Sequence, residues 1–227
     1  MTTDSSKPPR LPRLWFLSAE ERGIHSRDIV PKLPRGTGVI YRDYCNPERR
    51  LRTRELARIC RRKGLVLLAG TSRPCSPPPP TAGVHVPSWS RRPLRARGLV
   101  TLSVHRGSDL RRARASRAHL FIAAPVFRTE AHPEAVPLGP LRLGLLARRL
   151  PGPVAALGGI TPVTARRLTG LGVYALCGSG LFTHAGADRE LAGLRVWCGP
   201  PSTRPPVRPA NPRDARRFRT YVRLQSR

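Results

Sequence analysis

Short apolar segments recur along the chain and are separated by longer stretches in which apolar positions return at helical spacing. The segments are mostly uniformly apolar and rich in Val and Leu, which is typical of parallel strands buried on both faces. They predict eight strands, at 14–17, 38–42, 65–69, 83–86, 99–104, 120–124, 154–157 and 173–177. Strands alternating with helices in this way indicate a (β/α)₈ barrel or an open α/β sheet.

The clearest predicted helix follows Asn46-Pro47-Glu48, with Asn46 as the N-cap and Pro47 in the first helical position. Its apolar stripe is expected at Leu51, Leu56, Ile59 and Cys60. Lys63-Gly64 supplies a cation and a C′ glycine at its end. Three further helices are predicted: one capped by Ser108 and running through Ala115, one at 141–150, and one that begins at Thr161-Pro162 and ends at Gly170.

One crossover breaks this pattern. The stretch 72–82 contains four consecutive prolines, 77–80, which remove backbone donors and clash with a preceding helical turn, so an extended linker is expected there. From Cys198 onward prolines interrupt every periodicity. We therefore predict a flexible N-terminus over 1–11, a single barrel domain over 12–197 and a basic, proline-rich tail over 198–227, for which disorder is favoured over a helix at 213–223.

The formal charge of +29 suggests an anionic partner such as nucleic acid or a membrane surface. The distribution of this charge along the chain argues against such a partner. Nearly all of it is arginine, spread over the whole chain in doublets such as Arg49-Arg50 and Arg111-Arg112, together with much Pro, Ala, Gly and Leu. A solvated basic surface produced by a GC-rich coding sequence is favoured over an electrostatic function, because the aromatic platforms of nucleic-acid modules are missing from a chain with 5% aromatic residues.

The five cysteines form no C-x-x-C pair and are odd in number, which argues against a zinc site and a disulfide framework and suits a reducing cytoplasm. The polar, proline-rich first residues contain no apolar core of a signal peptide, and no long apolar window predicts a membrane span. A cytoplasmic location is therefore expected.

Four motifs in order along the chain resemble those of the thiamine phosphate synthase and TenI family. The stretch 124–133, APVFRTEAHP, resembles G-P-V-F-x-T-x-T-K, and 153–161, PVAALGGIT, is similar to P-V-x-A-I-G-G-I-T. Upstream, 83–86 matches G-V-H-L and 102–105 resembles V-S-T-H. The resemblance covers about residues 12–185 and implies a (β/α)₈ TIM barrel that couples an aminopyrimidine pyrophosphate to a thiazole phosphate, releasing pyrophosphate through a pyrimidine cation with Mg²⁺ assistance.

Two glycine turns form the predicted phosphate edge of this barrel. Gly158 and Gly159 follow the seventh strand, and Ser179 and Gly180 follow the eighth, which are the loops with which barrels commonly bind phosphate. Glycine lets the backbone approach an anion and donate N–H groups to it, although simple tight turns would also use glycine. The resemblance adds Thr129, kept from the family motif, and His132, which stands where the family has lysine.

The pyrophosphate and metal side matches the family less well. The resemblance implies catalytic roles for Arg42, retained from Q-x-R-x-K, and for Ser103, whereas the lysine of that motif is Tyr44 here. Both expected Mg²⁺ carboxylates are replaced, by Thr71 after Gly70 and by Ser90, which are poor ligands for a hard cation. Asp43 is a weak substitute, with a surface or helix-start carboxylate as the alternative.

Three functions remain open at this point. The first is a divergent thiamine phosphate synthase with small phosphorylated substrates. The second is a catalytically degenerate phosphate-ligand-binding barrel of the same superfamily. The thiazole tautomerases are disfavoured, because they carry a catalytic histidine where this chain has Pro125. The third is a basic nucleic-acid-associated protein, which would bind DNA in a salt-dependent manner without residues 198–227.

Overall fold

The computed structural model describes residues 11–70, 81–90, 98–183 and 194. Eight parallel strands pair in sequence order, and the last pairs with the first, so the sheet is a closed barrel. The strands are β1 (Leu14–Leu17), β2 (Gly38–Tyr41), β3 (Val66–Gly70), β4 (Gly83–Val86), β5 (Leu99–Val104), β6 (Leu120–Ala123), β7 (Val154–Leu157) and β8 (Val173–Gly178). This confirms the predicted (β/α)₈ fold, and every predicted strand is present with ends within one residue.

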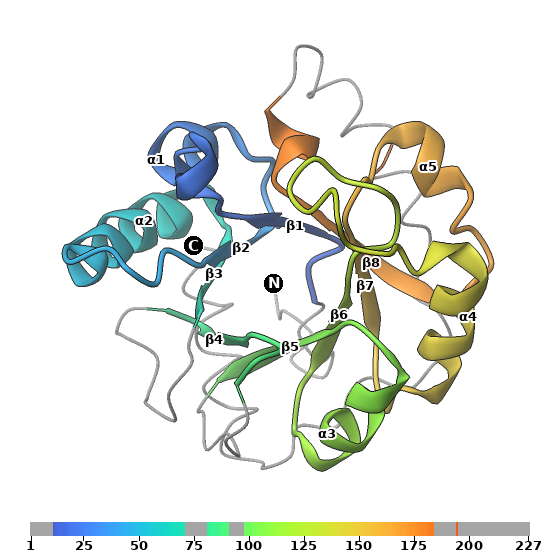
Figure 1. The fold of residues 1–227 in the computed structure, drawn as a ribbon. Coiled ribbons are helices and arrows are strands. Elements are labelled where there is room, and N and C mark those ends of the chain that lie inside the picture. The colour runs from blue at the N-terminus through green and yellow to red at the C-terminus, as the bar shows by residue number, and fades with distance from the viewer. Residues whose placement is uncertain (1–10, 71–80, 91–97, 184–193, 195–227) are drawn as a thin grey trace, which may run out of the picture.

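Helices surround the barrel, as the view along its axis shows (Figure 1). They are α1 (Ser26–Ile29), α2 (Arg49–Lys63), α3 (Leu110–Ala115), α4 (Gly139–Arg149) and α5 (Pro162–Arg166), with 3₁₀ turns η1 (Glu20–Arg22), η2 (Val30–Lys32), η3 (Gly107–Asp109) and η4 (Gly180–Phe182). The predicted proline-rich crossover 72–82 lies outside the described residues except for its last two, as does the predicted tail 198–227. No helix in the described ranges is long and apolar enough to cross a membrane.

Two predicted helix starts were wrong. Asn46 does not cap α2: its side-chain oxygen accepts the N–H of Glu48 at 2.8 Å in a turn before the helix, which begins at Arg49. Ser108 does not cap α3 either. Instead, the Asp109 carboxylate accepts the N–H groups of His105 and Arg106 on one oxygen, Oδ2, at 2.8 and 3.2 Å, and so holds the turn that precedes α3.

The helix at Thr161 begins as predicted but is shorter. The Thr161 hydroxyl accepts the N–H of Thr164, which is the predicted N-cap, yet α5 ends at Arg166 and the chain continues in turns to Gly170. In α2 the predicted apolar stripe is confirmed at Leu56 and Cys60, which are buried, but Leu51 is exposed.

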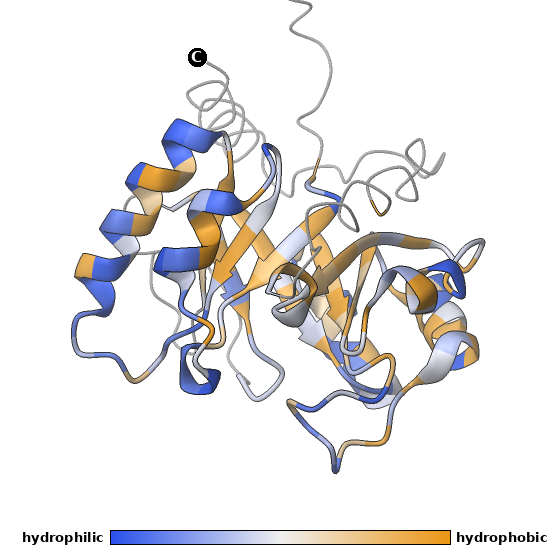
Figure 2. Cartoon of the chain, turned by 90° about the horizontal axis from the view of Figure 1, so that it is seen from above, coloured by the Kyte–Doolittle hydropathy of each residue, from blue (hydrophilic) through white to orange (hydrophobic). Residues whose placement is uncertain are grey.

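Two layers of apolar side chains hold the barrel together, one inside it and one between the sheet and the helices. Figure 2 shows that the strands are mostly hydrophobic, whereas hydrophobic and hydrophilic residues alternate along the helices. Side chains of alternate strand residues fill the interior, among them Trp15, Leu17, Ile40, Leu68, Leu120, Ile122 and Cys177. The outer layer joins the opposite faces of the same strands to helix residues such as Leu56 and Leu143. Because both faces are covered, the strands are uniformly apolar, which is why the sequence predicted them well.

The segment before β1 closes the N-terminal end of the barrel. Leu11 packs on the interior cluster, and its carbonyl accepts a hydrogen bond from the Tyr174 hydroxyl at 2.8 Å. The guanidinium of Arg13 lies 4.0 Å from the centre of the Tyr174 ring and donates to the Tyr174 carbonyl. The end that remains for chemistry is therefore the opposite one, where the strands terminate.

Gly38 gives a direct test of interior packing, because the fully buried Trp15 ring covers it. A Cβ at position 38 would lie 2.1 Å from the Trp15 ring. We expect Gly38→Ala to lower the free energy of unfolding by about 1–3 kcal/mol through overpacking, measured by urea denaturation. Gly107→Ala is the matched control: a Cβ there meets no atom within 4 Å, so a loss as large as that of Gly38→Ala would contradict this account.

Candidate active site at the barrel mouth

The carboxyl ends of all eight strands meet at one mouth of the barrel, and the predicted site residues lie around it. Strand pairing sets their order: Leu17 pairs with Ile40, Gly70 with His85, Ser103 with Ile122, and Leu157 with Cys177. Arg42 therefore follows β2 on one side of the mouth, Ser103 lies on β5, and the glycine turns follow β7 and β8 next to each other.

Arg42 is fixed at the mouth by β1. Its backbone N–H donates to the Ser18 hydroxyl at 2.7 Å, and its Nε and Nη2 donate to the Ser18 carbonyl at 3.2 and 2.9 Å. Burial lowers the pKa of the Arg42 guanidinium, although arginine remains charged at any physiological pH. Since one edge of the guanidinium is used by Ser18, the terminal nitrogen Nη1 is left to meet an anion.

Ser103 is held by a buried histidine. His85 Nε2 lies 3.2 Å from the Ser103 hydroxyl, and His85 Nδ1 lies 2.9 Å from the Thr101 hydroxyl. Burial, followed by the nearby charges of Arg42 and His105, lowers the pKa of His85 to about 3, so its ring is neutral near pH 7. A neutral imidazole donates at one nitrogen and accepts at the other, so it orients both hydroxyls.

Arg112 holds the loop after β4 in place through hydrogen bonds. Its Nη1 donates to the carbonyls of Pro87, Ser88 and Ser90, and its Nη2 donates to the carbonyl of Ser103 at 2.7 Å. One guanidinium thus ties the loop that carries Trp89 and Ser90 to the strand that carries Ser103. From the sequence, Arg111-Arg112 was interpreted as a solvated doublet, so the role of Arg112 in holding this loop was not predicted.

The predicted phosphate edge is built from two interlocked loops. Val126 and Phe127 donate their backbone N–H groups to the carbonyls of Leu157 and Gly158, at 2.8 and 3.0 Å. Gly158 and Gly159 both have positive φ, 97° and 62°. A Cβ at Gly159 would lie 2.3 Å from the carbonyl oxygen of Arg128, so glycine is required there both by φ and by the close approach of the neighbouring loop.

The remaining predicted phosphate residues lie in these loops or beside them. Thr129 forms a turn in which its carbonyl accepts the N–H of His132. The exposed His132 ring lies 3.6 Å from the Glu134 carboxylate. Ser179 is buried, and its hydroxyl donates to the Leu17 carbonyl at 2.6 Å, so this side chain joins β8 to β1.

The residues at the expected metal positions do not fit Mg²⁺. Thr71 lies outside the described residues, and the Ser90 side chain is neutral and buried. Asp43 already accepts hydrogen bonds from Tyr41 at 3.2 Å and from Asn46 at 2.7 Å. In the described part of the chain, no three His, Cys, Asp or Glu side chains gather as a metal site would require.

An unpredicted cluster lies at the ends of β2, β3 and β4, beside Gly70 and Ser90. Tyr44 and Trp89 follow β2 and β4, and their rings meet edge to face at 5.8 Å between centroids. The Arg49 guanidinium lies 5.6 Å from the Tyr44 centroid, and its Nη2 donates to the Gly70 carbonyl. Only the position of these two aromatic residues directly after strands could have signalled this cluster in the sequence.

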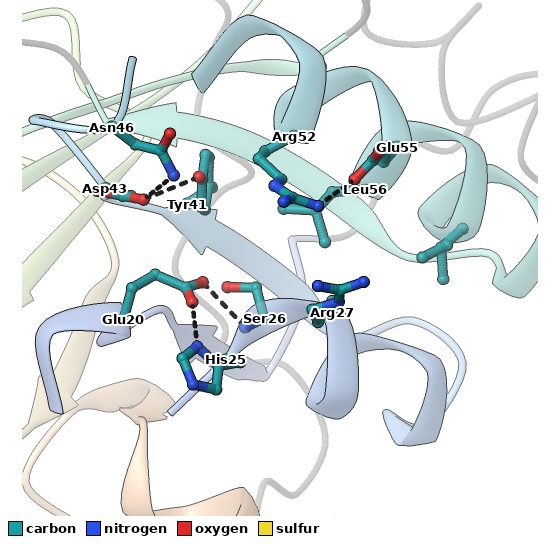
Figure 3. A pocket seen from close by; sticks show the side chains of 11 residues that line it. Glu20, His25, Ser26, Arg27, Tyr41, Asp43, Asn46, Arg52, Glu55 and Leu56 are labelled. Carbon is teal, nitrogen blue, oxygen red and sulfur yellow. Dashed lines mark hydrogen bonds and ion pairs between the residues drawn. The ribbon is translucent and has the colours of Figure 1, made fainter. Parts of the chain in front are cut away.

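A separate polar cavity of about 350 Å³ lies outside the barrel, between α1 and α2 (Figure 3). Glu20 lies on one side of it, accepting the N–H of Ser26 and contacting His25, while Arg52 and Glu55 pair on the α2 side. Asp43 points toward this cavity, which agrees with its bonds to Tyr41 and Asn46 rather than with a role at the mouth.

Fold and mouth together define a (β/α)₈ barrel protein with its functional groups at the carboxyl ends of the strands. Residues 35–180 match the family model described as thiamine monophosphate synthase. The chain therefore belongs to the thiamine monophosphate synthase family, as its motifs had indicated.

Individual relatives agree with this assignment. A protein of Aquifex aeolicus named "Putative thiamine-phosphate synthase 2" is 31% identical over 105 residues, which are 44% of this chain and 56% of that protein. The match thus spans about half the length of this curated relative. Thiamine phosphate pyrophosphorylase from Pyrococcus furiosus superposes with a TM-score of 0.65 at 19% identity, covering 82% of this chain and 94% of the other.

The barrel itself is shared more widely. Orotidine 5′-phosphate decarboxylase from Pyrococcus horikoshii has a TM-score of 0.52 at 14% identity, over 80% of this chain and 99% of that one. 3-Keto-L-gulonate-6-phosphate decarboxylase from Vibrio cholerae has a TM-score of 0.55 at 9% identity, over 83% and 98%. At such identities the likeness concerns the fold alone.

The buried His85 predicts a specific dependence of stability on pH. The pKa of histidine is about 6.5 in the unfolded chain, so between about pH 6.5 and pH 3 the unfolded state binds a proton that folded His85 does not. Stability is therefore lost as the pH falls through this window. Its slope from this residue is at most about 1.4 kcal/mol per pH unit.

We expect His85→Asn, whose amide does not ionise, to have a shallower acid loss than the parent protein. The free energy of unfolding from urea titrations at several pH values below about 6.5 measures both slopes. Equal slopes would show that His85 is protonated in the folded state.

Proposed function

We propose that this protein binds a thiazole phosphate at the β6–β8 edge of its mouth and couples it to an aminopyrimidine pyrophosphate. The observation that supports this most is the interlocked pair of loops at 125–129 and 158–159, because both carry the family motif and both glycines are required there. The backbone N–H groups of Gly159 and Gly180, with Thr129 and His132 at the rim, would bind the phosphate.

Arg42 and Ser103 would act on the other substrate. In the coupling, the bond from the pyrimidine methylene carbon to the pyrophosphate oxygen breaks, and the thiazole nitrogen forms the new bond to that carbon. The electron pair leaves on pyrophosphate, where the free edge of the buried Arg42 guanidinium offsets the growing charge. His85 orients the Ser103 hydroxyl toward this half of the mouth.

A barrel that binds the thiazole phosphate without coupling it is the second candidate. The specific observation in its favour is that Thr71 and Ser90 stand where the family has its metal carboxylates, and hydroxyl groups are poor ligands for Mg²⁺. The cytoplasm is the compartment we propose for either function, since Cys45, Cys60 and Cys177 are free and both ligands are phosphorylated intermediates.

The decisive experiment combines a binding and a product measurement on the full chain. We expect calorimetry to detect binding of the thiazole phosphate, and chromatography to detect thiamine phosphate when the aminopyrimidine pyrophosphate is added. Binding without product would support the second candidate. A folded protein that neither binds the thiazole phosphate nor makes product would exclude both.

Gly159 tests the site of binding. Because a side chain there must displace the neighbouring loop at Arg128, we expect Gly159→Ala to weaken thiazole phosphate binding by at least about tenfold, or about 1.4 kcal/mol. Gly170→Ala is the matched control, since Gly170 also has a positive φ, 78°, but a Cβ there meets no atom. Equal affinities of the two variants would place the phosphate elsewhere.

A further inference from the structure

The Tyr44 ring fills the space beside Gly70 at the end of β3, one residue before the expected metal position Thr71. A Cβ placed at Gly70 would be 2.8 Å from the Tyr44 hydroxyl and 3.0 Å from its Cε1. A side chain at position 70 and the Tyr44 ring therefore cannot both occupy their positions. At the end of β3, an aromatic ring thus takes the space that a side chain at position 70 would need.

The rebuilt region, which we call the aromatic corner, consists of Tyr44, Trp89, Arg42 and Arg49. Its rings are accessible: Trp89 is 59% exposed and Tyr44 is 37% exposed, although both lie beside the buried ends of β3 and β4. Aromatic faces of this kind stack on planar rings and attract cations. The edge-to-face contact at 5.8 Å holds the two rings at an angle of 73°. Since the Arg49 guanidinium lies over the Tyr44 ring, the more exposed Trp89 ring is the larger stacking surface.

The two guanidinium groups place positive charge on the aromatic corner. Arg49 lies against the Tyr44 ring, and its buried Nε has no hydrogen-bond partner among the residues that the structure describes. Arg42 presents its Nη1 from β2. Burial raises the pKa of the Tyr44 hydroxyl, while the charges of Arg42 and Arg49 act in the opposite direction, which agrees with both cations lying near the ring.

A planar ring and an adjacent cation pair complement a heteroaromatic ligand that carries a diphosphate. Mg²⁺ ordinarily supplies the positive charge for such a diphosphate, together with carboxylates that hold the metal. Here the cations belong to the protein itself. The Nη1 groups of Arg42 and Arg49 are not used in the bonds to Ser18 and Gly70, and guanidinium groups bind phosphate oxygens without a metal.

We propose that the aromatic corner binds the aminopyrimidine pyrophosphate without Mg²⁺, with its ring against Tyr44 and Trp89 and its diphosphate against Arg42 and Arg49. The identity of this ligand rests on the proposed function. The metal independence rests on the geometry of the corner, which is a property of this chain.

The test is titration of the full chain with aminopyrimidine pyrophosphate, once in excess EDTA and once in excess Mg²⁺. We expect the two affinities to agree within about twofold, a difference of about 0.4 kcal/mol. Tryptophan fluorescence in a Trp197→Phe background provides a second readout, because of the two remaining tryptophans Trp89 is exposed whereas Trp15 is fully buried. Trp89→Phe should abolish the ligand-induced change. Binding that occurs only with Mg²⁺ would overturn the proposal.

Matched variants assign the binding to the corner. We expect Arg49→Gln and Trp89→Ala each to weaken binding in EDTA by about tenfold, as loss of about 1.4 kcal/mol implies. Arg50→Gln, which removes the exposed neighbour of Arg49, should leave the affinity unchanged. Parent-like affinity of both Arg49→Gln and Trp89→Ala would overturn the proposal.

A double-mutant cycle tests the exchange between Tyr44 and position 70. Gly70→Ala should weaken binding in EDTA by displacing the Tyr44 ring, but should have no further effect in a Tyr44→Ala background. Additive effects of the two substitutions would contradict the steric coupling. Thermal unfolding of each variant confirms that it is folded.

Thiazole phosphate binding separates this proposal from the proposed function. If the thiazole phosphate binds but the pyrimidine ligand requires Mg²⁺, the aromatic corner proposal fails and the proposed function stands. If the pyrimidine ligand binds in EDTA and the thiazole phosphate does not bind, the proposed coupling fails and the corner stands. Absence of all binding overturns both.

Discussion

The pairing of the first strand with the last is the constraint on which the site depends. β1 pairs with β8 through Leu14 and Leu176 and through Phe16 and Gly178, and the Ser179 hydroxyl adds a bond to the Leu17 carbonyl across 162 residues of sequence. Ser18, the next residue, holds Arg42. Closure therefore brings the proposed phosphate turns and the pyrophosphate arginine onto one rim, whereas an open sheet would leave them at opposite edges.

The arginine excess has more than one physical role. Arg50 and Arg111 are exposed, as expected of a solvated basic surface, but their neighbours Arg49 and Arg112 turn toward the barrel mouth. Arg112 neutralises the dipoles of carbonyls from two segments, and burial lowers its pKa without removing its charge. Composition alone could not separate the exposed arginines from those that face the mouth. The position of each arginine around its helix decides which member of a doublet faces inward.

The sequence predicted the strands because burial on both faces leaves an unbroken apolar signal. It predicted helix boundaries less well, because Asn46 and Ser108 could cap a helix or a preceding turn, and the outcome depends on which N–H groups come within reach. The four-residue helix α1 is too short to leave a periodic pattern. Its position beside α2 creates the outer cavity, which no local signal indicated.

Among the proposed site residues, the sequence could place at the mouth those carried by motifs, but not those brought together by strand adjacency. Arg42 and Ser103 lie at strand ends that the sequence identified, and both are at the mouth. Tyr44 could be recognised only as a missing lysine. The contacts of Tyr44 depend on the register of β2, β3 and β4, which places the Tyr44 ring over Gly70 and against Trp89.

The presence of arginine and aromatic side chains in place of metal carboxylates would change the balance between binding and catalysis. A metal held by carboxylates concentrates its charge on the leaving oxygens, whereas a guanidinium spreads one charge over a plane. As proposed, the aromatic corner would bind a diphosphate and a ring, but it would polarise the breaking bond less than Mg²⁺ would. The same geometry accounts for both candidate functions, because a barrel that binds both substrates without a metal retains affinity more readily than it retains rate.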